Sequence, residues 1–203
     1  PPKHPRLLDS LSADFQKDWD VKQLIKRMVM SKSYQQDSVN IKGKSRASRV
    51  RLDAEVLRDQ ALAISGLLNR QIGGPPARPY QPAGVWKAVS TAISDTRIYK
   101  QGTGSDLYRR SLYTIHKRTA ITPILANFDA PSRQTCSVQR EVTNTPLQAL
   151  QLMNDTQFIE AARALAAWSV KQKDPVSSMF KRATCRLPDK KEKSLLTKLL
   201  KSF

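Results

Sequence analysis

The sequence predicts a mainly α fold, an irregular helical bundle with long proline-rich loops and at most a short strand or hairpin. Two observations support this prediction. Apolar residues recur every three or four positions in several segments, which is the period of a helix with one buried face. Prolines gather between residues 71 and 122, where Pro75, Pro76, Pro79 and Pro82 disfavour any long regular element.

Two short helices are expected at the start of the chain. Apolar residues after Pro5 are spaced for a helix that ends near Lys17, and proline suits a first helical turn. Asp20 can cap a second helix that runs to Ser33, because its carboxylate can accept hydrogen bonds from the first free N–H groups. We expect these two helices to pack as a hairpin.

A longer helix is predicted over residues 49–69, where apolar side chains again follow the helical period. The polar stretch before it, residues 38–48, is typical of a solvated loop. We expect the run Gly73-Gly74-Pro75-Pro76 to end the helix.

The region from residue 71 to 122 is expected to be irregular. Within it, Leu107, Tyr108 and residues 111–115 are rich in aromatic and β-branched side chains, which favour extended backbone. They predict a short strand or one arm of a hairpin.

The last part of the chain predicts further helices. Thr145 before Pro146 is a capping hydroxyl followed by a first-turn proline, and the helix should reach about Val170 with a break at Asn154 and Asp155. We interpret residues 143–155 as a buried helix entrance.

Two more helix starts follow this segment. Asp174-Pro175 begins a short helix that residues 185–188 end, and Asp189 caps the last helix.

Composition limits the class of protein. Of 203 residues, 39% are hydrophobic and 26% charged, which fits a folded chain of one domain. We predict a single helical domain over residues 1–203, truncated at its N-terminus, with residues 171–203 as a basic appendage of that domain. No apolar run approaches the roughly 18 residues of a membrane-spanning helix.

The charge predicts an anionic partner. Thirty-five Lys and Arg against 17 Asp and Glu give a formal charge of +18, which attracts polyanions. The excess is peripheral: residues 171–203 hold ten basic and three acidic residues, whereas residues 129–170 hold three and four.

Three runs carry a resemblance to a known family: Gln-Pro-Ala-Gly-Val-Trp at residues 81–86, Asp-Leu-Tyr-Arg-Arg-Ser-Leu-Tyr at residues 106–113, and Thr-Asn-Thr-Pro-Leu-Gln-Ala-Leu-Gln-Leu-Met-Asn-Asp at residues 143–155. With them the chain resembles, over nearly its whole length, the C-terminal planctomycete-type family called domain of unknown function 1553.

The resemblance implies a C-terminal part of a large exported protein, located in the periplasm, at the cell surface or outside the cell. It also implies upstream domains of the same polypeptide as partners, often with a cytochrome-c-like haem domain. The chain itself has no Cys-x-x-Cys-His sequence, so we expect no cofactor in it and place any haem in an adjoining domain. His116 stands where the family usually has an aromatic residue, which argues against a catalytic role for it.

One candidate site surrounds the start of the helix after residue 143. A helix N-terminus offers unpaired N–H groups, so an anion could bind there beside two arginines; the alternative is that the polar side chains only tie a loop to the helix. This anion-binding or structural cluster comprises Asp129, Arg133, Cys136, Arg140, Thr143, Asn144, Thr145, Asn154 and Asp155.

A second candidate is a glycan or polyanion surface in which aromatic and basic residues alternate, suited to stacking sugars and pairing anions. It comprises Trp86, Tyr108, Arg109, Arg110, Lys117 and Arg118. The alternative is that these aromatic side chains anchor loops to the core.

Other chemistry is less favoured. Cys136 and Cys185 are interpreted as small buried apolar residues, and two histidines with two cysteines at no recognised spacing predict no metal site. Glu55, Arg58 and Asp59 share a helix and predict a salt-bridged face, with acid–base hydrolysis as the alternative.

Three functions therefore stay open. We favour a non-catalytic accessory module that binds acidic extracellular polysaccharide. The alternatives are a part of an exported redox or polysaccharide-acting enzyme, and a nucleic-acid-binding domain. Nucleic acid is the least favoured partner, because the sequence contains no recognition-helix motif.

Overall fold

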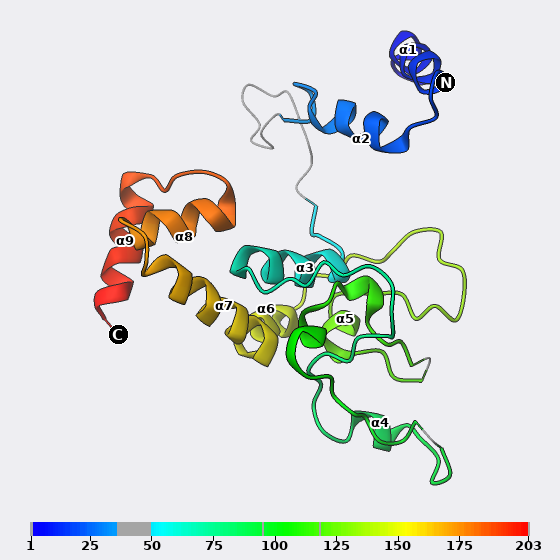
Figure 1. Cartoon of the computed structure of the whole chain (residues 1–203), viewed down its shortest axis with the longest axis vertical. Coiled ribbons are helices and arrows are strands. Elements are labelled where there is room, and N and C mark those ends of the chain that lie inside the picture. Colours follow the sequence, from blue (N-terminus) through cyan, green and yellow to red (C-terminus); the bar gives the residue numbers. More distant parts are fainter. Residues whose placement is uncertain (1, 36–49, 95, 118, 203) are drawn as a thin grey trace. The chain divides into compact units, whose positions relative to one another are not determined.

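Figure 1 shows the computed structural model of the chain, in which residues 2–35, 50–94, 96–117 and 119–202 are described. These residues form nine α-helices and two 3-10 helices, with isolated β-bridges and no β-strand, which confirms the mainly α prediction. The chain divides into two compact units, Pro1–Arg51 and Leu52–Phe203. The domain boundaries expected from the sequence stay predictions.

The first unit contains α1 (Pro5–Phe15) and α2 (Val21–Val29). The Asp20 carboxylate accepts hydrogen bonds from the backbone N–H groups of Lys22 and Gln23, as its capping role predicts. Arg27 of α2 donates to Asp14 of α1 at 2.8 Å, so the two helices contact each other as a hairpin. Helix α2 ends before the predicted Ser33, and the loop predicted at residues 38–48 lies outside the described residues.

Helix α3 (Ala54–Ser65) begins the second unit and ends earlier than predicted. Gly66 adopts a left-handed backbone with φ +86°, and Leu67 N–H then closes onto the carbonyl of Leu62 at 2.9 Å. Glycine reaches this conformation without the steric cost of a Cβ atom. The predicted stop at residues 73–76 is therefore wrong, because Gly66 has already ended the helix.

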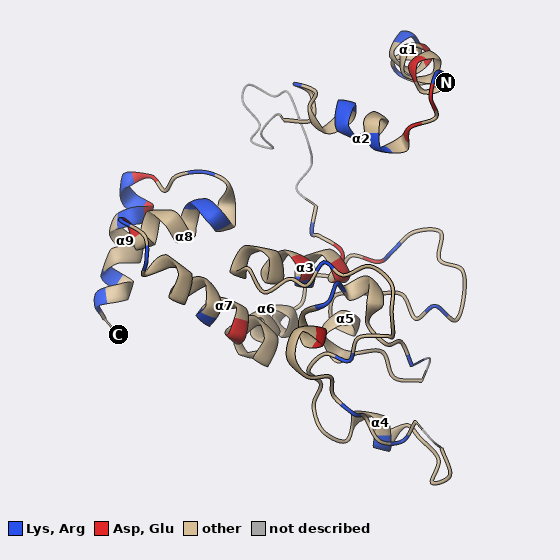
Figure 2. Ribbon diagram, in the orientation of Figure 1, with Lys and Arg blue, Asp and Glu red and all other residues tan. Residues whose placement is uncertain are grey.

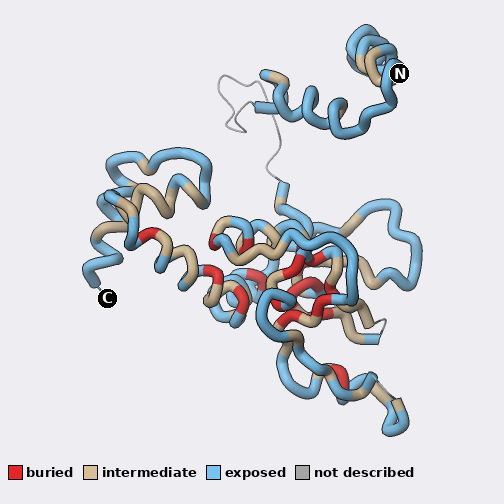
Figure 3. Tube along the Cα trace, in the orientation of Figure 1, coloured by how far each residue is buried: buried red, intermediate tan, exposed pale blue. Residues whose placement is uncertain are grey.

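A small apolar core forms where α3 meets α5 (Pro123–Ala126) and α7 (Thr156–Ser169). Figure 3 shows the buried residues concentrated in this part of the second unit. The buried residues of this core, each less than 8% exposed, are Ala54, Ile124, Leu125 and Phe128. The partly buried side chains of Leu57, Ile121, Ala130 and Phe158 pack against them.

The proline-rich region is irregular, as predicted, but it contains short helices instead of a strand. It holds α4 (Val85–Ala88) and the 3-10 helices η1 (Gly104–Tyr108) and η2 (Ser111–Tyr113). The strand predicted at residues 107–108 and 111–115 is wrong. The carbonyl groups of Leu107 and Arg109 bind the Arg58 side chain, so they are not available for a strand ladder.

The C-terminal helices start where their capping residues predict. They are α6 (Pro146–Asn154), α7, α8 (Pro175–Thr184) and α9 (Lys190–Lys201). Thr145 and Asp189 form reciprocal capping boxes with the side chains three residues on, and Asp155 caps α7 at the predicted break. No helix within the described ranges is long and apolar enough to cross a lipid bilayer.

Residues 143–155 form a helix entrance, but the prediction that this entrance is buried is wrong. Thr143, Asn144 and Thr145 are exposed, and Gln148 alone is buried in α6. Leu147 and Leu150 remain 53% and 56% exposed. The helix is attached by polar side chains instead of by an apolar face.

Candidate functional site

Two members of the cluster predicted around residue 143, Asp129 and Thr143, are hydrogen-bonded to each other. Asp129 accepts from the backbone N–H of Thr143 at 2.8 Å and from its hydroxyl at 2.9 Å. Asp129 sits in the left-handed region with φ +61°, and this local turn aims its carboxylate at the loop before α6. The contact ties a loop to a helix start, which is the structural alternative considered for this cluster.

Arg140 pairs with α3 instead of with an exogenous anion. Its guanidinium donates to both oxygens of Glu55, at 2.7 and 3.3 Å, and lies 3.5 Å from Asp53. Burial raises the pKa of Glu55, but the hydrogen bond from Arg140, a backbone hydrogen bond and the charges of Arg140 and Arg133 together outweigh burial, and the net pKa is lowered. The same bond raises the pKa of Arg140.

The remaining cluster residues are not gathered around a common point. Arg133, Cys136 and Asn144 are exposed, and Asn154 donates to the carbonyl of Leu150 within its own helix. Cys136 and Cys185 are both free and exposed, so the prediction that they are buried is wrong. No group of ionisable side chains within the described residues could hold a metal ion.

A chain of amide contacts connects α6 to the interior. Gln148 donates to the Asn127 carbonyl at 2.8 Å, Asn127 donates to Gln151 at 2.7 Å, and Gln151 reaches Asp155 at 3.4 Å. Asp155 accepts from the backbone N–H of Gln157 at 2.9 Å. These bonds hold the Asp155 carboxylate against Gln151 and the start of α7.

This series of hydrogen bonds ends at Arg58, which is only 1% exposed. Its Nε donates to Gln157 at 2.6 Å, and its two terminal nitrogens donate to the carbonyls of Arg109 and Leu107, each at 2.8 Å, and to the hydroxyl of Ser111 at 3.0 Å. Burial lowers the pKa of Arg58 to about 10. The side chain therefore fastens α3, α7 and the two 3-10 helices to one another.

The prediction that Arg58 lies on a salt-bridged face of its helix missed this buried role. Ala54 and Leu62 lie four residues before and after Arg58, on the same helical face, and both are buried. That spacing was the available signal that Arg58 points inward.

The residues of the predicted polyanion surface are separated by the fold. Arg109 is 2% exposed and donates to the carbonyls of Pro75 and Gly73, and Tyr108 donates to Glu160 at 2.7 Å, which raises the pKa of Tyr108. Arg110 lies 3.9 Å from Asp59, and Arg118 lies outside the described residues. Arg109 and Tyr108 thus anchor loops, and only Trp86 and Lys117 stay together.

Trp86 of α4 lines a pocket, and Lys117 contacts the Trp86 ring without belonging to the pocket lining. Trp86 is 4% exposed, Tyr99 meets its ring edge-on at 4.9 Å, and the Lys117 ammonium lies 5.0 Å from the ring centre. Burial raises the pKa of Tyr99 to about 12, and its hydroxyl donates to the Pro79 carbonyl at 2.5 Å. These contacts hold the rings of Trp86 and Tyr99 in place as an aromatic wall of the pocket.

The Trp86 pocket has a volume of about 300 Å³. Lys87 and Arg97 contribute positive charge, and Gln81 contributes a polar amide. Gly84 adopts φ +86° at the start of α4 and lets the chain turn at the pocket wall. Its lining residues are Gln81, Pro82, Ala83, Gly84, Trp86, Lys87, Arg97, Ile98, Tyr99 and Gln101.

The side-chain amide of Gln81 is shielded from solvent, and neither its oxygen nor its nitrogen has a hydrogen-bond partner among the described residues. A buried polar group in this state costs roughly 1–3 kcal/mol. A bound molecule recovers that energy by supplying both an acceptor and a donor once the side chains that cover the amide shift and bring it to the pocket surface. The arrangement therefore suits a polar ligand with anionic groups and a partly apolar face.

Comparison with known proteins gives one match. The chain is similar over residues 1–200 to a family model described as PSD1, Protein of unknown function (DUF1553). No curated protein and no solved structure matches the chain.

Proposed function

Since the chain belongs to the PSD1 family of proteins of unknown function (DUF1553), which its residues 1–200 match, we propose that it is a non-catalytic accessory module that binds acidic polysaccharide in the Trp86 pocket. The observation that carries this proposal is the unpartnered Gln81 amide in the wall of that pocket.

The chemistry of an acidic sugar fits the three kinds of group in the pocket. Neighbouring hydroxyls of a sugar ring can accept from and donate to one amide, as Gln81 requires. The C–H faces of the ring suit the partly exposed Tyr99 ring, which packs edge-on against the buried Trp86. A carboxylate or sulfate on the sugar suits Lys87 and Arg97.

The same groups favour binding over catalysis. Acid–base hydrolysis of a glycosidic bond needs two carboxyl groups on either side of it, and the pocket lining contains no Asp or Glu. In the cluster around residue 143, Asp129 and Asp155 are occupied by Thr143 and Gln157. An exported location and upstream domains of the same polypeptide are part of this proposal, which rests there on the family resemblance. Any haem is assigned to an adjoining domain.

The test measures binding of a short galacturonic acid oligomer to the full chain by isothermal titration calorimetry. Gln81→Leu removes the amide but keeps a similar volume, so we expect it to abolish detectable binding without loss of stability. Lys87→Ala removes one charge contact and should weaken binding by about two- to fivefold, the range expected for an exposed ion pair.

The matched control is Lys190→Gln with Lys191→Gln, which removes two exposed charges from α9, away from the pocket lining. It should leave oligomer binding unchanged. Equal affinities of the Gln81→Leu variant and the unmodified chain would contradict the proposal. The nucleic-acid alternative would be supported if the unmodified chain bound duplex DNA more tightly than the oligomer and the α9 variant no longer bound the DNA.

A further inference from the structure

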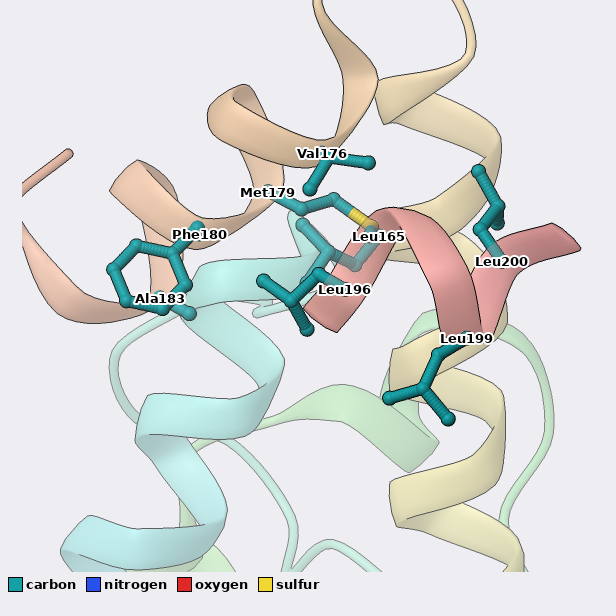
Figure 4. A pocket seen from close by; sticks show the side chains of 8 residues that line it. All are labelled: Leu165, Val176, Met179, Phe180, Ala183, Leu196, Leu199 and Leu200. Carbon is teal, nitrogen blue, oxygen red and sulfur yellow. The ribbon is translucent and has the colours of Figure 1, made fainter. Parts of the chain in front are cut away.

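The three last helices enclose an apolar groove that the proposed glycan binding does not use. We call it the α7–α9 groove. Its volume is about 430 Å³, and Figure 4 shows apolar side chains of α7, α8 and α9 pointing into a shared space. It is lined by Leu165, Val176, Met179, Phe180, Ala183, Leu196, Leu199 and Leu200.

The residues that line the groove have the sequence spacing that helix packing requires. On α8 it is lined at positions 176, 179, 180 and 183, and on α9 at positions 196, 199 and 200, the one-sided pattern with which helices pack against each other. Neither α8 nor α9 contains a buried residue, and Leu199 and Leu200 are 56% and 63% exposed. Contiguous exposed apolar surface of this kind marks an interaction site.

The walls of the groove are held in place without an occupant. Arg182 of α8 lies 4.2 Å from the Trp168 ring of α7, and Arg186 lies 4.8 Å from the Phe180 ring. Lys193 of α9 pairs with Asp174 at the start of α8, and Glu192 pairs with Arg186 at 2.6 Å. A preformed groove loses little conformational entropy on binding.

Charge indicates the kind of partner. Residues 171–203 contain ten basic and three acidic residues. Asp174 and Glu192 are held in ion pairs, and Asp189 caps α9. Several lysines of α8 and α9 are exposed and have no ion pair among the described residues, and Figure 2 shows blue segments along both helices; they are Lys181, Lys190, Lys191, Lys198 and Lys201.

We infer that the α7–α9 groove docks one amphipathic α-helix of a partner protein, with acidic residues beside its apolar stripe. The apolar stripe fills the groove, and the positive field of α8 and α9 attracts the acidic flanks. A second copy of this chain is disfavoured because both copies carry the formal charge of +18. A membrane surface is disfavoured because the apolar side chains line a hollow between helices.

The test uses a fluorescein-labelled synthetic peptide of about 18 residues, roughly five helical turns, with leucines on one face and glutamates beside them. Fluorescence anisotropy measures its binding to the full chain. Leu199→Gln puts a polar group in the groove and should weaken binding about tenfold or more. Ala183→Gln fills the groove from an exposed position of α8 and should do the same.

The matched control is Leu195→Gln, on the same helix and 62% exposed but outside the groove lining; it should bind like the unmodified chain. A peptide of the same composition with its leucines scattered, and one with lysines in place of glutamates, should both bind weakly. Circular dichroism checks that each variant keeps its helices.

Three results would overturn the inference. Leu195→Gln and Leu199→Gln could weaken the binding of the peptide equally. The chain could bind vesicles of phosphatidylglycerol and phosphatidylcholine through Leu199 while ignoring the peptide. Sedimentation could show self-association that Leu199→Gln abolishes, which would make a second copy the occupant.

Discussion

The guanidinium of Arg58 binds two backbone carbonyls, one hydroxyl and one amide in the interior of the Leu52–Phe203 unit. Asp59, at 3.6 Å, supplies opposite charge and also accepts from the backbone N–H of Ser111 at 2.7 Å. A buried cation with all these partners is held firmly, and removing it leaves its acceptors without donors.

We predict that Arg58→Met lowers the free energy of unfolding by about 3–5 kcal/mol, the range for breaking a buried charged network. Arg110→Met is the control, because the Arg110 side chain is 48% exposed and lies 3.9 Å from Asp59. Urea unfolding followed by circular dichroism measures both. Similar losses for the two variants would show that Arg58 does not organise the interior.

For single residues, the sequence predicts contacts with neighbouring residues better than contacts with residues far along the chain. Asp20, Thr145 and Asp189 cap the helices that follow them, since an N-cap depends only on neighbouring residues. The partners of Arg58 are Leu107, Arg109 and Gln157, far along the chain. Local spacing signals that Arg58 points inward, but no local pattern specifies the groups that Arg58 binds, so these contacts could not be predicted.

Helix α6 depends on its first turn because few of its apolar side chains are buried. Thr145 accepts from the backbone N–H of Gln148 at 3.4 Å, and Gln148 accepts in return from the N–H of Thr145 at 3.2 Å. The prediction that this entrance is buried failed because apolar spacing shows that a helix has a face, but not whether a neighbour covers it.

We expect Thr145→Ala to destabilise the protein by about 1 kcal/mol, the usual value of a lost N-cap. Asn144→Ala, at the exposed neighbouring position, should change stability by less than about 0.5 kcal/mol. Thermal unfolding by calorimetry compares the two. An effect of Asn144→Ala equal to that of Thr145→Ala would argue against the capping box.

The α8–α9 pair is predicted to respond to acid. The hydrogen bond from Arg186 lowers the pKa of Glu192 from 4.5 to about 2. A carboxyl whose pKa is lowered by folding contributes stability that is complete above its unfolded pKa and is lost as the pH falls toward the folded value. The ion pair should therefore weaken progressively below about pH 4.5.

NMR titration of the Glu192 carboxyl measures this directly. The resonance should titrate near pH 2 in the unmodified chain and at a higher pH in Arg186→Gln, where the hydrogen bond from the Asp189 backbone still keeps the pKa below the ordinary glutamate value. Titration near the ordinary value in both proteins would show that Arg186 and Glu192 do not pair in solution.

For the whole molecule, the mainly α class and the order of the helices follow from the sequence, since helical periodicity and caps are local signals. The structure of the proline-rich region was harder to predict. Its aromatic and β-branched residues favour a strand, but Tyr108 and Tyr113 lie in 3-10 helices next to Leu107 and Ser111, which bind Arg58. Neither the Trp86 pocket nor the α7–α9 groove is visible in local patterns, because each joins residues from separate segments.

The distribution of charge separates two kinds of binding. The exposed lysines of α8 and α9 attract any polyanion, and this attraction weakens as salt shortens the Debye length to about 8 Å at physiological ionic strength. The Trp86 pocket combines charge with an amide and an aromatic wall. Under the proposed function, the pocket is the site that distinguishes an acidic sugar from other anions.

The most direct test of that claim is an NMR titration of the isotope-labelled chain with the galacturonic acid oligomer. We predict that the side-chain amide of Gln81 and the indole N–H of Trp86 shift first and saturate together, while the amides of α9 remain unchanged. Shifts confined to the lysine-rich surface of α9, with Gln81 and Trp86 unmoved, would contradict the account.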